Sequence, residues 1–506
     1  MKTATVSLQR IQWQFVSAEG RSLLKELPGD SLSGEVIKAI PKRRVVRRPG
    51  VFAKEVYYWG WAALLKTLGG GTACREGRIS LALAKAGISV PEVFAYGVEK
   101  RNGLLRRDLL LTREEPRGKS LLEVMRRDYP TLPFRVKLQL VGEFACFIKG
   151  LHNAGVLHAD LHIGNILWLP ERDNGKRFVL LDTDRVTLKN RPLSSRQRTA
   201  NLALLLGNLW TLVSRSQRFR FLRFYGIRLD RQGRRFITEL EAKALKHSNT
   251  IWQKKAQRCL CNNRHFGREK RNGFTVFYSK RAGIEELLDS LLADPDRLLE
   301  DGQIFKAGNT VRAAKIELNG KSYFLKRFNC KGWSYRIKNT FRRSRAVRSW
   351  LVSWGFYVRS LPVAEPFVCL EERRMRLLGR SYVLFDFVEA TESLARFWPQ
   401  LDAAAKKRLL TRLALLLGRL HLFGGLHGDL KWSNILVRGQ MAKELYLIDL
   451  DGSKIVGTGK PRTKRKDLER FLLDLTKSQA GDIDKALFLK CWKRWSSCTL
   501  MENKKI

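Results

Sequence analysis

The chain has 506 residues, with 96 Lys and Arg against 48 Asp and Glu, and its formal net charge is +48. This length is too great for one typical hydrophobic core and predicts two or three domains, while the charge predicts an anionic partner such as nucleic acid, acidic lipid or a phosphorylated glycan. Eight cysteines without a C-x-x-C pair favour reduced thiols inside the cell, and the absence of a secretion-signal core or of an apolar run of roughly 18 to 20 residues favours a soluble or membrane-peripheral protein.

The first predicted elements are a strand and a helix. The strand GVFAKEVYYW carries Lys54, and the helix that follows presents Glu76 near its start. A longer helix with an apolar stripe at residues 140–151 ends before Gly155. The segment HADLHIGNIL at residues 158–167 therefore falls on a loop, where catalytic side chains are commonly held.

A short strand, RFVLLDTDR, follows this loop and ends on the acidic pair Asp182 and Asp184. Residues from about 190 to 280 are basic and predicted to be helical, and we interpret them as the back of a first domain. The acidic helix at residues 284–302 contrasts in charge with its surroundings. We therefore predict domain 1 at residues 1–280, an acidic helical junction at residues 281–300 and domain 2 at residues 301–506.

The second half repeats these elements. A possible hairpin turn precedes the strand KSYFLKRFN, which carries Lys326; a helix, the loop HGDLKWSNIL and the strand ELYLIDLDG follow. Asp160 and Asp429 are 269 positions apart, as are the Asn residues of the two loops, and the two Lys are 272 positions apart. Such constant spacing indicates an internal duplication.

The repeated residues fit phosphoryl transfer from a nucleotide. That reaction needs a cation on the phosphates, oxygen ligands for magnesium, a base for the acceptor hydroxyl and a cover over the phosphates. The cover is weak, because single glycines, Gly34 and Gly308, stand in place of a glycine-rich loop. The candidates for the other parts are Lys54 and Lys326 for the phosphates, Asn165, Asp182, Asn434 and Asp449 for the metal, and Asp160 and Asp429 as bases.

The two copies differ at the helical glutamate that usually pins the phosphate-binding lysine. Domain 1 has Glu76, whereas the corresponding segment of domain 2, RRSRAVRSWLVSWGF, has no acidic residue and places Ser344 or Arg345 there. The sequence thus predicts that domain 2 is altered or silent.

The segments VLHADLHIGNILW and LLDTDR, with KAGNTVRAAKIELNGKSYFLKRFN and GRSYVLFDFVE in the second half, resemble the bacterial lipopolysaccharide core kinases, the Kdo and heptose kinase family (WaaP-like). The resemblance spans roughly residues 30–240 and 300–475. It implies an α+β fold class with two tandem protein-kinase-like bilobal domains, each with a strand-rich N-lobe and a helical C-lobe. It also implies ATP and Mg²⁺ as cofactors, Asp160 and Asp429 as catalytic bases, and structural roles for His158 and His427.

The function expected from this resemblance is phosphorylation of a sugar hydroxyl, on Kdo or heptose, in the lipopolysaccharide inner core. The partner would be this or another anionic glycolipid, met at the cytoplasmic face of the inner membrane. DTD and DLD replace the DFG of protein kinases and no APE-like segment follows, which disfavours peptide substrates. Lys431, counted here with the nucleotide-binding residues, nevertheless matches the HxDLKxxN form of serine/threonine kinases and leaves a protein substrate open.

Two alternatives of other classes remain. A pseudokinase scaffold would bind an anionic partner without turnover, and domain 2 is the better candidate for this role because it lacks the glutamate. A nucleic-acid binder is favoured by the charge but by no recognisable motif, and no specific nucleic acid is expected.

Overall fold

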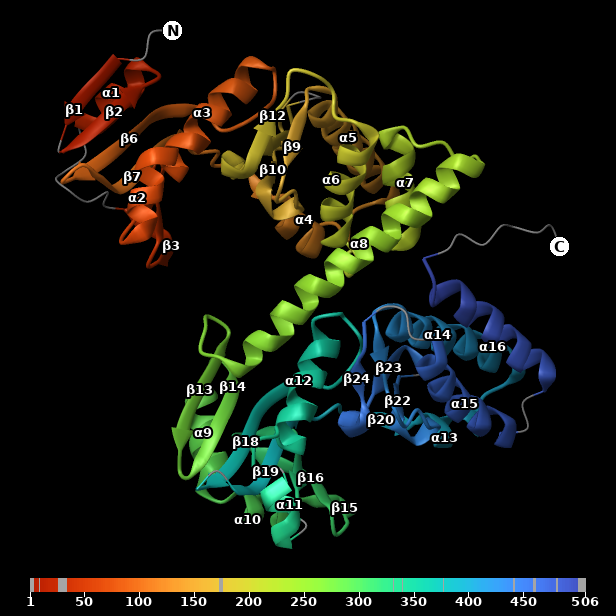
Figure 1. Cartoon of the computed structure of the whole chain (residues 1–506). Coiled ribbons are helices and arrows are strands. Elements are labelled where there is room, and N and C mark those ends of the chain that lie inside the picture. The colour runs from red at the N-terminus through yellow and green to blue at the C-terminus, as the bar shows by residue number, and fades with distance from the viewer. Residues whose placement is uncertain are drawn as a thin grey trace. The chain divides into compact units, whose positions relative to one another are not determined.

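The computed structural model describes residues 4–8, 10–25, 34–172, 176–330, 332–338, 340–375, 377–439, 442–457, 461–478 and 481–498. The chain forms two compact units, Met1–Ala244 (unit 1) and Leu245–Ile506 (unit 2). Each unit combines an antiparallel sheet with a set of helices (Figure 1), which confirms the predicted α+β class. No helix in the described ranges is long and apolar enough to cross a membrane.

The strand-rich part of unit 1 is a seven-stranded antiparallel sheet. Alternating apolar residues bury one of its faces, with Trp13 and Leu109 almost inaccessible to solvent. Helices α2 (Trp61–Gly69) and α3 (Thr72–Lys85) follow strand β5 (Val51–Tyr57) in the chain. The strand order is β1 (Ala4–Leu8), β2 (Ile11–Phe15), β6 (Val93–Arg101), β7 (Leu104–Arg113), β5 (Val51–Tyr57), β4 (Arg43–Arg48) and β3 (Glu35–Ile40).

The helical part of unit 1 holds the motif loops. The predicted apolar stripe lies on α5 (Phe134–Asn153), where Leu140, Ile148 and Leu151 are buried. Gly155 then reverses the chain with a φ of 77°, and a Cβ there would collide with the carbonyl oxygens of two nearby residues. The other elements are α4 (Leu121–Arg127), α6 (Ser195–Gly207), α7 (Arg215–Tyr225), the first part of α8 (Arg231–Gln257), and the short strands β8 (Lys119–Ser120), β9 (Val156–His158), β10 (Ile166–Trp168), β11 (Phe178–Leu180) and β12 (Val186–Leu188).

Unit 2 repeats this arrangement. Its sheet has seven strands whose order corresponds to that of unit 1, so the duplication includes the two-stranded hairpin at the sheet edge. The order is β13 (Phe266–Arg271), β14 (Phe274–Ser279), β18 (Pro366–Arg374), β19 (Leu377–Asp386), β17 (Lys321–Phe328), β16 (Val311–Leu318) and β15 (Gln303–Ala307). The helices that follow the Lys326 strand are α11 (Gly332–Lys338) and α12 (Arg345–Tyr357).

The helical part of unit 2 again surrounds short strands. Helix α14 (Ala403–Leu422) corresponds to α5 and buries the predicted stripe of leucines. The remaining elements are α13 (Leu394–Phe397), α15 (Pro461–Lys477), α16 (Asp482–Trp495), β20 (Thr391–Ser393), β21 (Gly425–Leu426), β22 (Ile435–Arg438), β23 (Glu444–Leu447) and β24 (Lys454–Ile455).

The compact units divide at a different place from the predicted domains. The units divide within α8, and residues 281–300 are not a junction but form α9 (Ile284–Ala293) and α10 (Pro295–Asp301), which pack against the unit 2 sheet. The physical reason is that α9 is amphipathic: Leu288 and Leu291 are fully buried, whereas the acidic face pairs with Arg271 of β13. The acidic residues that distinguish this segment in the sequence therefore lie on the exposed face of α9, and they do not mark a linker.

Candidate active sites

Lys54 of unit 1 lies at the centre of a buried ion-pair cluster. It projects from β5, which pairs with β7 and β4, and its Nζ donates to the carboxylate of Glu76 on α3. The same Nζ lies 2.9 Å from Oδ1 of Asp182. Both Lys54 and Glu76 are less than a tenth exposed. The structure therefore brings together three residues that are up to 128 positions apart in the sequence.

Asp182 follows β11 and adopts a left-handed backbone conformation, with φ of 49° and ψ of 54°. Asp tolerates this conformation better than most residues with a Cβ. Its Oδ1 also accepts a hydrogen bond of 2.7 Å from Arg43 on β4. Burial by itself raises the pKa of Asp182, but the charges of Lys54 and Arg43 outweigh it and lower the pKa well below the usual range. Asp182 is thus held as a carboxylate.

The loop after β9 positions Asp160 through its own backbone. The Asp160 N–H donates to Nδ1 of His158 at 3.1 Å, and Nδ2 of Asn165 donates to the Asp160 carbonyl at 3.2 Å. Asn201 of α6 fixes His158 by bonding both its N–H and its carbonyl. Burial lowers the pKa of His158, which favours the neutral ring that an accepting Nδ1 requires. The contacts of His158 are those of a structural support.

The carboxylate of Asp160 remains accessible. Its side chain is half exposed, with Nη1 of Arg185 at 3.5 Å and Nε2 of His162 at 4.0 Å. A cavity of about 490 Å³ lies beside the loop, with Lys54 and Asp182 in its lining. Glu76, Asn165 and apolar side chains from both parts of the unit complete the wall, among them Val45, Leu110 and Leu167.

Unit 2 neutralises its lysine differently. Nζ of Lys326 on β17 lies 2.7 Å from Oδ1 of Asp449 and 2.7 Å from Oδ2 of Asp451. Asp449 has the same left-handed backbone as its counterpart in unit 1, with a φ of 56°. Nη2 of Arg345 lies 3.6 Å from Asp451. A second carboxylate therefore faces the lysine, although it comes from the loop and not from the helix.

The counterpart of Glu76 is Ser349, and the predicted positions Ser344 and Arg345 are wrong. Ser349 is the fifth residue of α12, as Glu76 is the fifth residue of α3, and both are buried. Ser344 instead caps α12, accepting a hydrogen bond from the N–H of Val347.

An equivalent hydrogen bond in each unit supports this alignment. The Ser89 carbonyl accepts from the Leu180 N–H in unit 1, and the Pro362 carbonyl accepts from the Leu447 N–H in unit 2. The acceptors Ser89 and Pro362 follow α3 and α12, and the donors belong to β11 and β23, the strands that precede the acidic pairs. The two helices therefore have the same register relative to these strands. The shift of Glu76 to Ser349, 273 positions, equals the shift of Ser89 to Pro362.

Sequence reasoning missed the role of Asp451. The acidic pair was visible in both copies, but Asp184, its counterpart, does not pair with Lys54, which has Glu76 instead. The signal available in the sequence was the combination of a lost glutamate with a retained second aspartate.

The second motif loop resembles the first. Nδ2 of Asn434 donates to the Asp429 carbonyl at 2.9 Å, and Asp467 of α15 accepts from the N–H of His427 at 2.7 Å. Lys431, which replaces His162, places its Nζ 2.9 Å from Oδ2 of Asp429. Lys431 therefore contacts the acid proposed to orient the acceptor.

The unit 2 cavity is open and has a volume of about 800 Å³. Lys326, Lys431 and Ser349 line it together with the candidate metal ligands of this unit. Substitution of the glutamate by serine has therefore not filled the cleft with side chains. The predicted silence of unit 2 finds no steric cause in this cavity.

The candidate metal ligands of each unit are two oxygen donors. Each unit offers one aspartate and one asparagine oxygen, Asp182 with Asn165 and Asp449 with Asn434. No cluster of three or more His, Cys, Asp or Glu side chains suited to a metal occurs in the described part of the chain. A set of two oxygen ligands fits Mg²⁺, which commonly takes one or two protein ligands and completes its shell with water and phosphate oxygens.

Comparison with known proteins defines the class. A family model described as "Lipopolysaccharide kinase (Kdo/WaaP) family" matches residues 61–225 and 289–492, and the chain is accordingly an ATP-dependent kinase. It belongs to the lipopolysaccharide kinase (Kdo/WaaP) family. The two matched segments are consistent with the internal duplication, because one lies in unit 1 and the other in unit 2.

One curated relative and one solved structure each match less than half of the chain. The lipopolysaccharide core heptose(I) kinase WaaP of Pseudomonas aeruginosa is 28% identical over 211 residues, which cover 39% of this chain and 78% of that protein. A solved structure, "WaaP in complex with acyl carrier protein", has 23% sequence identity and a TM-score of 0.32, and the match covers 45% of this chain and 92% of that chain.

Proposed function

We propose that the chain transfers the γ-phosphate of ATP to a sugar hydroxyl, on Kdo or heptose, of the lipopolysaccharide inner core. The observation that carries the proposal is the cluster of Lys54, Glu76 and Asp182 beside Asn165 at the wall of one cavity. Phosphoryl transfer requires a cation for the phosphates, a carboxylate that holds this cation in place, and oxygen ligands for a metal ion.

The arrangement of each unit supports a protein-kinase-like bilobal fold. In unit 1 the lysine and its glutamate come from the strand-rich part, whereas Asp160, Asn165 and Asp182 come from loops in the helical part. The cavity is lined by residues of both parts, which suits a nucleotide held between two lobes. Unit 2 repeats the arrangement.

Each residue has a distinct role in the proposed reaction. Lys54 holds the phosphates, and Asp160, whose carboxylate is accessible, accepts the hydrogen bond of the attacking hydroxyl and orients it. Asn165 and Asp182 would hold Mg²⁺, which neutralises charge on the phosphate oxygens when bound. The low pKa of Asp182 keeps that ligand ionised at neutral pH.

Unit 2 is proposed to bind nucleotide as well. Lys326 keeps two carboxylate partners and Asn434 keeps its place beside Asp429, so the electrostatic requirements for phosphate and metal are met without a helical glutamate. Two working units would give the chain two acceptor hydroxyls or two steps on one core.

The substrate assignment is supported by the family and by charge. The P. aeruginosa relative is named a core heptose(I) kinase, and a net charge of +48 suits a phosphorylated, acidic saccharide on a lipid at the membrane surface. At 28% identity the choice between Kdo and heptose stays open.

The test is transfer of label from ATP with magnesium to purified lipopolysaccharide, with a generic protein substrate in parallel. The proteins are wild type, Asp160→Ala, Asp429→Ala and the double variant. We expect label on the saccharide, loss of a distinct product with each single variant, and loss of all product in the double variant. Label on protein alone, or undiminished saccharide labelling by the double variant, would refute the assignment.

A further inference from the structure

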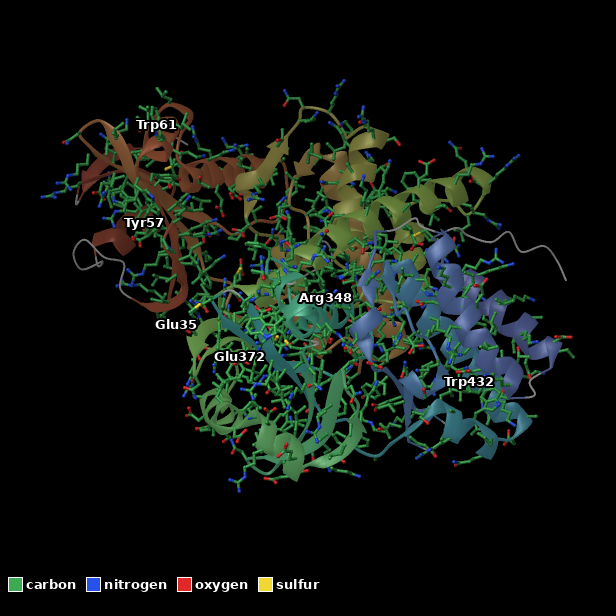
Figure 2. The ribbon with its side chains drawn as sticks, turned by 60° about the horizontal axis from the view of Figure 1, so that its bottom comes forward. Glu35, Tyr57, Trp61, Arg348, Glu372 and Trp432 are labelled. Atoms are coloured by element: carbon green, nitrogen blue, oxygen red, sulfur yellow. The ribbon has the colours of Figure 1, made fainter. Side chains whose placement is uncertain are left out.

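Helix α2 of unit 1 presents its large apolar side chains to solvent. Trp61, Leu65 and Leu68 are 80%, 67% and 82% exposed, and Leu64 beside them is also exposed. At 100° per residue these four positions fall within one face of the helix. Figure 2 shows Trp61 at the surface of this part of unit 1.

The opposite, smaller face of α2 fixes the helix to the sheet. Ala63 is buried in a cluster with Tyr58 and Leu105. Oγ1 of Thr67 accepts a hydrogen bond of 2.8 Å from the Leu105 N–H of β7. The usual pattern of a surface helix is thus inverted, because small residues face the protein and large apolar residues face away. Such a face lowers the free energy only when something apolar covers it.

Unit 2 carries the same feature at the same place in the chain. The segment between its Lys326 strand and α12 contains α11, and Trp333, Ile337 and Phe341 in this segment are 68%, 64% and 89% exposed. Trp333 and Ile337, four residues apart, lie on one face of α11, and Phe341 comes after the end of this helix. The sequences of the two segments differ, so the shared property is the exposed apolar face with a tryptophan at its start.

The charge around these faces is positive. Residues 330–348 contain seven Lys or Arg and no Asp or Glu, and Arg342 and Arg343 are exposed beside Phe341. Residues 57–75 contain Lys66 and Arg75 and likewise no acidic residue. The two segments combine exposed tryptophan, aliphatic side chains and cations, which is the composition of helices that lie in the interface of an anionic membrane.

We propose that the exposed apolar side chains of residues 59–68 and of residues 332–338 and 340–343 are membrane-contact elements by which each unit docks on an anionic lipid surface. Trp61 and Trp333 would lie at the headgroup level, the neighbouring apolar side chains would enter the acyl boundary, and the flanking Lys and Arg would bind lipid phosphates. The elements carry none of the candidate catalytic residues. The inference deepens the proposed function, because it states how a lipid-anchored acceptor is reached.

The test is co-sedimentation of the full-length protein with vesicles of phosphatidylglycerol and phosphatidylethanolamine, compared with phosphatidylcholine vesicles. One variant carries Trp61→Ser, Leu65→Ser and Leu68→Ser, and a second carries Trp333→Ser, Ile337→Ser and Phe341→Ser. A matched control replaces three other exposed apolar residues, Val136, Leu473 and Ile483, by Ser.

We expect binding to the anionic vesicles, a loss of affinity of about tenfold or more in each variant because membrane affinity follows buried apolar area, and no loss in the control. Hydrogen–deuterium exchange on vesicles should show protection in the two segments. The proposal would be overturned if the wild-type protein did not bind anionic vesicles or if the variants bound like the control. Protection confined to other segments would also overturn it and would point to a different surface.

A second readout separates this proposal from the proposed function. Both variants should phosphorylate a water-soluble, delipidated core saccharide at the wild-type rate, since their substitutions lie outside the cavities. Loss of vesicle binding with retained transfer supports the membrane elements. Absence of transfer by wild type, with vesicle binding intact, would refute the kinase substrate and leave the membrane elements standing. Loss of transfer to the soluble saccharide in the variants would overturn the assignment of these segments to lipid contact alone.

Discussion

Asp451 is expected to stabilise unit 2 by serving as the second counter-ion of Lys326. The variant Asp451→Asn keeps the shape of the side chain and removes its charge. Lys326 is almost buried, and its Nζ lies 2.7 Å from each of two carboxylates. A hydrogen bond that involves charged groups contributes about 1.5–3 kcal/mol, and because Asp449 remains as a partner we expect a loss of about 2 kcal/mol in the free energy of unfolding.

The matched control is Asp184→Asn in unit 1. Asp184 is the second acid of the corresponding pair, but Lys54 is neutralised by Glu76 and Asp182. The same substitution at this site should therefore change the free energy of unfolding by less than about 0.5 kcal/mol.

Buried cysteines allow the two units to be measured separately. Cys369 lies in the core of unit 2 and Cys74 on α3 of unit 1; burial raises the pKa of both thiols, that of Cys74 to about 12. Each should react with an alkylating pulse only after its own unit unfolds, so mass spectrometry of labelled peptides along a urea series gives one midpoint for each unit. This avoids the assumption of a single transition, which two-domain chains often violate.

Asp451→Asn should lower the Cys369 midpoint by about 1 M urea and leave the Cys74 midpoint in place. Adding Ser349→Glu should restore the Cys369 midpoint, because this position faces the same cavity as Lys326. A shift of the Cys369 midpoint by Asp451→Asn no larger than the shift of the Cys74 midpoint by Asp184→Asn, or a further fall when the glutamate is added, would refute the counter-ion role of Asp451.

Three further predictions concern unit 1 and the separate activities. Asp160→Ala and Asp429→Ala should each lower transfer at their own product by about 10²- to 10⁴-fold, measured by mapping the phosphorylated sugar positions, with unchanged product from the other unit. Glu76→Gln removes one of the two carboxylates facing a buried lysine and should lower the Cys74 urea midpoint as well as kcat/KM, by about tenfold or more; an unaltered kcat/KM would contradict the pinning role. Burial, with Arg198 as a smaller cause, lowers the pKa of His152 from 6.5 to about 4. The unfolded state therefore binds the proton more tightly, and unit 1 should lose up to about 3 kcal/mol as the pH falls from about 6.5 to about 4, measured at Cys74; His152→Gln should remove most of that slope, and an equally steep slope in the variant would show another group responsible.

The motif loops could be predicted because their information is local. The spacing between Asp160 and Asn165 is fixed by hydrogen bonds within five residues, and the leucine stripe of α14 appears as helical periodicity in the sequence. The strand position of Lys54 follows from a short apolar run between turn signals. These elements lie as expected, whereas the catalytic roles of their residues remain predictions.

The pairing of Asp451 with Lys326 did not follow from the sequence pattern alone, because it joins residues more than a hundred positions apart. The 22 positions between Lys54 and Glu76, counted from Lys326, end at Arg348, one residue before Ser349. The side chain that faces the cavity is decided by the packing of α12, on which Trp350 and Phe356 are also buried. The start of unit 2 did not follow from the sequence pattern for a related reason. The pairing of β14 with β18 joins residues almost a hundred positions apart, and no local pattern distinguishes an edge hairpin from the end of the preceding domain.

The two units reach the same charge balance with different residues. In unit 1, Lys54 and Arg43 face Asp182 and a carboxylate from α3; in unit 2, Lys326 and Arg345 face two aspartates of one loop. Two cations and two anions meet at each site. Selection would not maintain a second carboxylate at the lysine of a unit without function, so this charge balance favours a functional unit 2. The mechanical consequence differs, however. Moving α3 breaks the Lys54 pair itself, whereas α12 carries Arg345, which faces Asp451, and no carboxylate partner of Lys326. A shift of α12 therefore disturbs the Arg345 contact and leaves both aspartates on the lysine.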